Sequence, residues 1–274
     1  DKTVVFDPFM NIDAAEELKA AAEYLTHRSA ALVINSHFHN DHIRGNQVFL
    51  PATIVSTYWT RQQMAISEPE ELKWEKENAP GILASYRQRA NTVTGWEKEE
   101  LPVWINYFEG MVQSGPKIKT TLPDLTFTDS IWISGSRLRI KLVEFRNAHT
   151  TSDAVLMLPD LGICFTGDLL FNQNHPYLGD GHADSLKQYL TNWLASPSLK
   201  QLVPGHGPLS DLSTVKEEIR YINSLQEIVK TQQREGKPDS VIVKSAIPAP
   251  YQRWYLSRFF ASNLSYLCSQ ASGH

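Results

Sequence analysis

Short apolar runs alternate with amphipathic segments along most of this 274-residue chain. Apolar positions at helical spacing predict a helix over about 13–25, and the apolar run 31–35 predicts the strand that follows it. Further strands are expected at 53–56, 131–133, 138–142, 154–158 and 162–165, the last two joined as a hairpin. Further helices are expected at about 184–195, 211–235 and 253–269. This alternation predicts an α/β protein in which two packed sheets are flanked by helices.

The stretch from about residue 58 to residue 115 has a helical pattern. Pro69 stands where a helix can start, Gly95 ends one helix, and 96–112 is expected to form the next. Its aromatic residues are Tyr58, Trp59, Trp74, Tyr86, Trp96, Trp104, Tyr107 and Phe108. Three roles stay open for them: a cap that builds an apolar substrate pocket, packing of the segment on the rest of the domain, or the surface of a homodimer.

The segment SHFHNDH, residues 36–42, directly follows the predicted strand 31–35. His37 and His39 are two positions apart, so on an extended backbone they can point at one metal ion. Asp41 and His42 follow where the chain is expected to turn into a helix, and they can face a second ion. Imidazole nitrogens and carboxylate oxygens are ligands that suit zinc, and also iron or manganese.

Three later segments supply ligands of the same kind after apolar, strand-like runs. His149 follows the run 140–145, Asp168 follows the run 162–165, and His206 lies in the segment VPGHG. A single histidine after a strand is usually a structural residue. Four strand ends that each deliver a ligand predict a metal centre, because α/β proteins place their sites at such ends.

The order HxHxDH, His149, Gly167-Asp168 and Pro204-Gly205-His206-Gly207 resembles the metallo-β-lactamase-fold hydrolase superfamily, from Val4 to about His206. The resemblance implies a four-layer αββα sandwich. Residues 1–274 would form one domain, with a helical cap insertion at about 58–115 between the first metal loop and the third ligand histidine.

The same resemblance implies a dinuclear centre and a ligand set. One ion would be held by His37, His39 and His149, the other by Asp41, His42 and His206, and Asp168 would bridge them. The antibiotic-degrading branch has cysteine at the bridging position. Aspartate there is the pattern of the glyoxalase II-like and lactonase-like hydrolases.

The activity implied is a metal-dependent hydrolase for a small molecule with an ester, thioester, lactone or β-lactam bond. Two divalent metal ions, with zinc the first expectation, would present a hydroxide that attacks the carbonyl carbon. Asp41 is the candidate catalytic residue for proton handling. Tyr177 is a candidate substrate-binding residue that donates to a substrate oxygen, unless it only packs on Pro176.

Residues behind the ligands are also expected. Asp7 resembles the aspartate that supports the metal loop by hydrogen bonding in this superfamily, with an ordinary turn residue as the alternative. His175 and His182 are expected at the surface or behind the ligands, and Asp184 is expected to cap the helix at 184–195.

Two other functions stay open. One is an iron-dependent oxidative member of the same fold, which His39 disfavours because the di-iron members carry glutamate in the HxHxDH segment. The other is a non-catalytic, metal-stabilised binding module.

Composition limits the partners. The formal net charge is −4 and basic runs are short, which argues against nucleic-acid processing. The sequence has no apolar stretch of about 18 residues, the length that a membrane span requires. Cys164 and Cys268 are expected as small core residues.

The chain begins abruptly at a strand, where the resemblance leads one to expect two or three earlier strands. A cytoplasmic, secreted or periplasmic location is therefore left undecided.

Overall fold

The computed structural model describes residues 2–196 and 198–271, and its contacts divide the chain into two compact units, Asp1–Glu144 and Phe145–His274. The elements of the first unit are β1 (Thr3–Phe6), α1 (Ile12–Thr26), β2 (Ala30–Ile34), α2 (Asn40–Ile43), η1 (Arg44–Phe49), β3 (Thr53–Thr57), α3 (Tyr58–Arg89), α4 (Trp96–Ser114), η2 (Gly115–Lys117), β4 (Leu125–Phe127), β5 (Ser130–Ser134) and β6 (Arg139–Arg146), which runs across the unit boundary. Those of the second unit are β7 (Ser152–Leu158), β8 (Ile163–Phe171), α5 (Ala183–Leu194), β9 (Gln201–His206), α6 (Leu212–Arg234), α7 (Asp239–Ile242), η3 (Ala249–Tyr251) and α8 (Arg258–Ala271).

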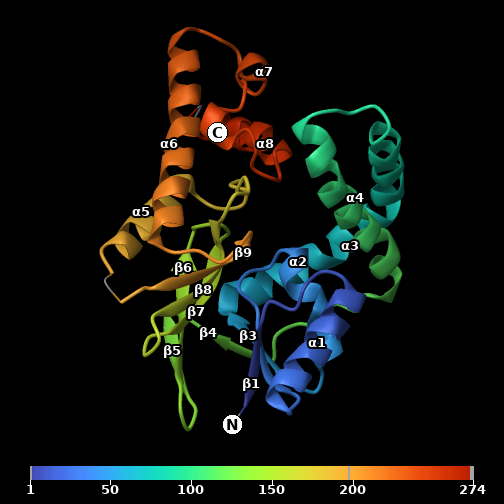
Figure 1. Cartoon of the computed structure of the whole chain (residues 1–274), viewed down its shortest axis with the longest axis vertical. Helices are drawn as coiled ribbons and strands as arrows, with labels where there is room; N and C mark the ends of the chain where they lie inside the picture. Colours follow the sequence, from blue (N-terminus) through green and yellow to red (C-terminus); the bar gives the residue numbers. More distant parts are fainter. Residues whose placement is uncertain (1, 197, 272–274) are drawn as a thin grey trace. The chain divides into compact units, whose positions relative to one another are not determined.

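Two sheets are present among the described residues, with strand orders β1-β2-β3-β4 and β5-β6-β7-β8-β9 (Figure 1). The strands of the first sheet are parallel, and β5 pairs antiparallel with β6. The predicted mixture of strands and helices in an α/β fold with two sheets is therefore confirmed.

The core of the first unit lies where α1 and η1 cover the first sheet. Val5, Val33 and Ile54 lie side by side on β1, β2 and β3. They form a buried apolar cluster with Ala15 of α1 and Phe49 of η1. This packing holds the end of β2 in place, and the segment SHFHNDH follows directly after it.

The segment 58–115 is helical, as expected, but one predicted boundary is wrong. The helix does not start at Pro69, because α3 runs from Tyr58 to Arg89 through Pro69 and Pro80. Thr57 caps it, since its Oγ1 accepts a hydrogen bond from the backbone N–H of Thr60 at 3.1 Å. The helix α4 agrees with the predicted 96–112. Figure 1 shows α3 and α4 side by side, and Tyr86 stacks on Phe108 between them.

In the second unit, β7 and β8 form the predicted hairpin, in which Leu156 pairs with Phe165. The strand β8 then continues parallel to β9 as far as the pair Phe171–His206, with irregular register on both sides of Gly167. Asp168 therefore lies inside β8, and the expectation that it follows the end of a strand is wrong. The irregular register bends β8 at the position where Asp168 is presented.

The helix α6 covers this sheet with a buried stripe. Its members recur at helical spacing: Val215, Glu218, Ile222, Leu225 and Val229. Glu218 is the polar member, and its Oε2 accepts a hydrogen bond from the backbone N–H of Phe171 at 2.8 Å. Burial raises the pKa of Glu218 well above its usual range, and its hydrogen bond to Phe171 fixes the end of β8.

Two helix starts in this unit differ from the prediction. His182, and not Asp184, caps α5, because its Nδ1 accepts from the backbone N–H of Ser185 at 3.3 Å. The last helix begins at Arg258 and not near Arg253. The backbone of Tyr255 is engaged elsewhere, since its N–H donates to the Gln173 carbonyl and its carbonyl accepts from the His175 N–H.

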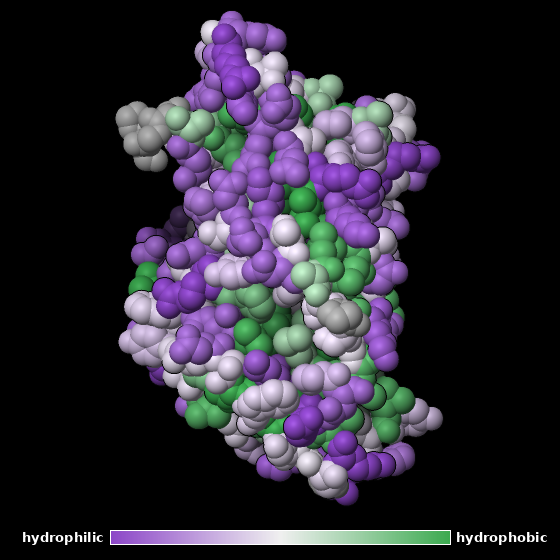
Figure 2. Space-filling model, turned by 90° about the vertical axis from the view of Figure 1, so that its left-hand side faces the viewer, coloured by the Kyte–Doolittle hydropathy of each residue, from purple (hydrophilic) through white to green (hydrophobic). Residues whose placement is uncertain are grey.

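Within the described residues no helix combines the length and the apolar character that crossing a membrane requires. Figure 2 shows one face of the molecule, on which hydrophilic side chains predominate and hydrophobic ones form smaller patches between them. Cys164 and Cys268 are buried and not joined in a disulfide, which confirms their prediction as core residues.

Candidate metal centre

The first unit presents its ligand candidates on the turn between β2 and α2. His37 is fully buried and His39 is the extended residue that precedes α2. His37 Nε2 lies 3.0 Å from His39 Nδ1. In the first turn of α2, His42 Nε2 lies 3.5 Å from Asp41 Oδ2. The structure thus brings His37 together with His39, and Asp41 together with His42, as the spacing predicts.

Asp7 organises this turn from the end of β1. Its Oδ1 accepts from the backbone N–H of Ser36 at 2.7 Å, and its Oδ2 accepts from the Ser36 hydroxyl at 2.7 Å and from His42 Nδ1 at 2.9 Å. Because the Ser36 hydroxyl donates to Asp7, it accepts from His37 Nδ1, which lies 2.8 Å away. Nδ1 of His37 and Nδ1 of His42 therefore each carry a proton. The other ring nitrogen, Nε2, is left without a proton in both residues and is the atom that can bind a metal. The predicted supporting role of Asp7 agrees with these contacts.

Close backbone packing carries Asp7 to this position. Asp7 has a positive φ of 57°, and the backbone N–H of Gly45 donates to the Phe9 carbonyl at 2.9 Å. A Cβ on Gly45 would lie 1.9 Å from the Pro8 carbonyl oxygen. This role of Gly45 could not be predicted from the sequence, because a glycine three residues after His42 is only a weak signal.

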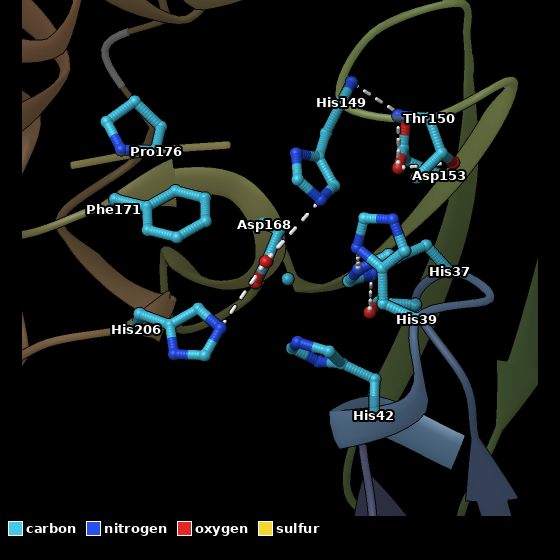
Figure 3. Close-up of polar contacts among 12 residues, drawn as sticks. His37, His39, His42, His149, Thr150, Asp153, Asp168, Phe171, Pro176 and His206 are labelled. Atoms are coloured by element: carbon cyan, nitrogen blue, oxygen red, sulfur yellow. Dashed lines mark hydrogen bonds and ion pairs between the residues drawn. The ribbon is translucent and has the colours of Figure 1, made fainter. Parts of the chain in front are cut away.

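The second unit presents His149 on the turn between β6 and β7. Asp153 holds this turn: its carboxylate accepts from the backbone N–H groups of His149 and Thr150, at 3.0 to 3.1 Å, and from the Thr150 hydroxyl at 2.9 Å (Figure 3). Gly181 packs closely on the same turn, since a Cβ there would lie 1.9 Å from the Ala148 carbonyl oxygen. Sequence reasoning missed Asp153, which reads as an ordinary polar residue at the start of a strand.

Asp168 is the centre of the ligand group in the second unit. Its Oδ2 lies 3.5 Å from His149 Nε2 and 3.4 Å from His206 Nε2, and the two rings approach it from different sides (Figure 3). Pairing of β8 with β9 sets the distance to His206, whose ring stacks on Phe171 with centroids 5.1 Å apart. A Cβ on Gly205 would lie 1.9 Å from Asp168 Oδ1. The absence of a side chain at Gly205 therefore leaves the space that the Asp168 carboxylate occupies.

Each ligand group fits a divalent cation by its donor chemistry. His37 and Asp168 are almost completely buried, and each faces the ring nitrogen of another candidate at 3.0 to 3.5 Å. Buried carboxylates and imidazoles are stable when a cation or a proton is shared among them. These nitrogen and oxygen donors suit zinc, iron or manganese, so the groups could hold metal ions of that kind.

The remaining predicted residues lie outside these ligand groups. Tyr177 is half-buried in the loop after β8 and packs on Phe259, with ring centroids 5.3 Å apart. Burial, and then the charge of Asp180, raises the pKa of Tyr177, so its hydroxyl stays protonated at neutral pH. His175 is not at the surface: it is buried, and its Nδ1 is 2.8 Å from the Tyr221 hydroxyl. Burial lowers the pKa of His175 to about 4.

Comparisons with known proteins agree with this fold. The family model described as metallo-beta-lactamase superfamily matches residues 1–206. Among solved structures, a metallo-beta-lactamase from Pontibacter korlensis is similar with a TM-score of 0.55 and 17% identity, over 81% of this chain and 84% of that one. TMB-1 is similar with a TM-score of 0.53 and 16% identity, over 81% of this chain and 80% of that one. No curated protein matches the sequence.

We expect the Asp7→Asn variant to bind Zn²⁺ about 10- to 100-fold more weakly than the wild type, the usual effect of losing a partner behind a metal ligand. Asparagine keeps the size and tolerates the positive φ, but it cannot accept all three hydrogen bonds, so His42 loses the partner for its Nδ1 proton. Competition with a chromogenic chelator measures the affinity. The exposed Asp13→Asn is the matched control. Unchanged Zn²⁺ affinity in Asp7→Asn would show that this carboxylate does not set the imidazole proton.

Proposed function

Since this chain belongs to the metallo-β-lactamase superfamily, we propose that it is a dinuclear metal-dependent hydrolase. Its substrate is a small molecule with a carbonyl-centred bond. The residues that hold the first ion are His37, His39 and His149, those that hold the second are Asp41, His42 and His206, and Asp168 bridges them.

The observation that carries the proposal is the position of the Asp168 carboxylate. A single oxygen, Oδ2, lies within 3.5 Å of the Nε2 atoms of His149 and His206. In the proposed assignment these two histidines hold different ions, so a carboxylate between them is where a bridging ligand belongs. Aspartate at this position, in place of cysteine, favours the glyoxalase II-like and lactonase-like hydrolases over the antibiotic-degrading branch.

The chemistry divides between the ions and the side chains. When bound by these residues, two divalent ions would supply an activated water at neutral pH and would polarise the carbonyl group of the substrate. Asp41 has a partly exposed carboxylate, 28% accessible, in the first turn of α2. It accepts the proton of the attacking water and returns it to the leaving group. Tyr177, a neutral phenol, donates a hydrogen bond to a substrate oxygen.

The charge of the chain favours a small substrate over a nucleic acid. A net charge of −4 without long basic runs provides little attraction for a phosphate backbone. Esters, thioesters, lactones and β-lactams all undergo the same attack at a carbonyl carbon. Zinc is the proposed metal. Iron in the purified protein would favour the oxidative alternative, and metal without turnover would favour a binding module.

We expect His37→Ala and Asp168→Ala each to lose bound metal and hydrolytic activity together, with turnover lower by more than about 100-fold, since even partners behind a ligand cost 10- to 100-fold. Both residues are assigned as metal ligands in this proposal, so the same loss is expected from either variant. Elemental analysis and turnover are measured on the same samples.

His27→Asn is the control for these variants. It removes an exposed imidazole at the end of α1, and asparagine tolerates the left-handed backbone there. Full metal content and activity in His37→Ala would disprove the ligand assignment. Loss in His37→Ala but not in Asp168→Ala would mean that the second unit does not supply the bridge.

We expect Tyr177→Phe to keep both metal ions but to lower kcat or raise KM by about 10-fold or more, because a hydrogen bond to a charged oxygen in the transition state is lost. The ring and its packing on Phe259 are retained in this variant. Tyr24→Phe, at a position that is 79% exposed, is the matched control. If Tyr177→Phe has wild-type kcat and KM on every substrate that the enzyme hydrolyses, Tyr177 does not bind the substrate.

A further inference from the structure

Both helices of the segment 58–115 contact Asn40, a residue of the ligand turn that is not itself a proposed ligand. Asn40 is buried and lies between His39 and Asp41, at the first position of α2. Its Nδ2 donates to Oε1 of Glu75 on α3 at 3.0 Å. Its Oδ1 accepts from the hydroxyl of Tyr107 on α4 at 3.4 Å. The Asn40 side chain is therefore held from two sides.

A buried ion network fixes the partner of Asn40. Arg44, 2% exposed, donates from Nη1 to Glu75 Oε2 at 2.7 Å and from Nε to Glu68 Oε1 at 2.8 Å. Glu68 and Glu75 are seven residues apart on α3, so they lie on the same face of the helix. The carboxylate of Glu71, on the same face, lies 3.9 Å from Arg44 Nη2. The Glu75 carboxylate thus joins Arg44 through one oxygen and Asn40 through the other.

An apolar contact accompanies these polar ones. Met64 of α3 is buried in one cluster with Phe38, which lies between His37 and His39, and with Ile43, which follows His42. The helix α3 therefore meets the turn through a buried methionine and, about three helical turns later, through Glu75. The turn is therefore held against α3 at two separate points.

From these contacts we propose that α3 is a positioning element of the metal centre. Glu75, oriented by Arg44, fixes Asn40, and Asn40 sets the direction in which the turn presents His39 and Asp41. The inference rests on the proposed function, because it concerns the ligands of that centre. It assigns to the helical segment a role in metal binding that is separate from covering a substrate or forming a dimer surface.

Stability alone does not account for this network. Buried ion networks can often be replaced by apolar residues without loss of stability, so their presence is weak support for a purely structural role. This network ends at the residue between two proposed ligands. Partners that orient metal ligands from behind commonly change metal affinity by 10- to 100-fold.

The Asn40→Ala variant tests the proposal without breaking the ion network, since Arg44 keeps both Glu68 and Glu75. The probe is Co²⁺, whose visible absorption spectrum reports the geometry of its ligands. We expect Asn40→Ala to bind Co²⁺ at least about 10-fold more weakly, with an altered spectrum, and Glu75→Gln to have a similar effect. In the double variant the two effects should not add, because both changes break the same link.

Glu109→Gln is the control, since it disrupts a more exposed ion pair between the same two helices, Arg87 with Glu109 at 2.8 Å. It should keep the wild-type Co²⁺ affinity and spectrum. If Asn40→Ala also keeps both while the wild type binds Co²⁺, the positioning role is wrong and the proposed function stands. If the wild type binds no Co²⁺ and no Zn²⁺, the proposed function fails, and the positioning role fails with it.

Discussion

The contact between a carboxylate and an imidazole is the interaction on which both ligand groups depend. In the first unit Asp7 accepts the Nδ1 proton of His42 directly and that of His37 through the Ser36 hydroxyl. In the second unit Asp168 lies between His149 and His206. An imidazole can bind a metal only through a nitrogen without a proton, so Asp7, which fixes the Nδ1 protons in the first unit, also fixes Nε2 as the ligand atom there.

The fold supplies these carboxylates by close backbone packing. Asp7 reaches the ligand turn because Gly45 lets the chain pass close to Pro8, and Asp168 fits because Gly205 has no side chain. Glu218 holds the end of β8 by accepting a hydrogen bond from the backbone N–H of Phe171, the residue that pairs with His206 of β9. Strand pairing, the contact from α6 and the close packing at two glycines therefore together fix the positions of a few ligand atoms.

Much of this arrangement could be predicted from the sequence, because ligand residues have a fixed order and a short spacing. HxHxDH predicts the pairing of His37 with His39, and apolar runs predict the strands that carry the later ligands. What the sequence could not show is set by contacts that no motif marks, some of them between residues far apart in the chain. Asp153, Gly45 and the link from Glu75 to Asn40 involve residues whose types are common in turns and helices. The start of α3 at Tyr58 differs from the expected start at Pro69, because Thr57 caps the helix at its beginning and the helix then continues through Pro69.

The most direct test of the account is the metal content of the purified chain, measured by elemental analysis together with chelator-sensitive hydrolysis of a lactone, a thioester, an aryl ester and a β-lactam. The account predicts close to two zinc ions per chain and metal-dependent turnover of one of these classes. Metal content near zero, with no turnover restored by added Zn²⁺, would contradict the dinuclear hydrolase and leave the fold without the chemistry assigned to it.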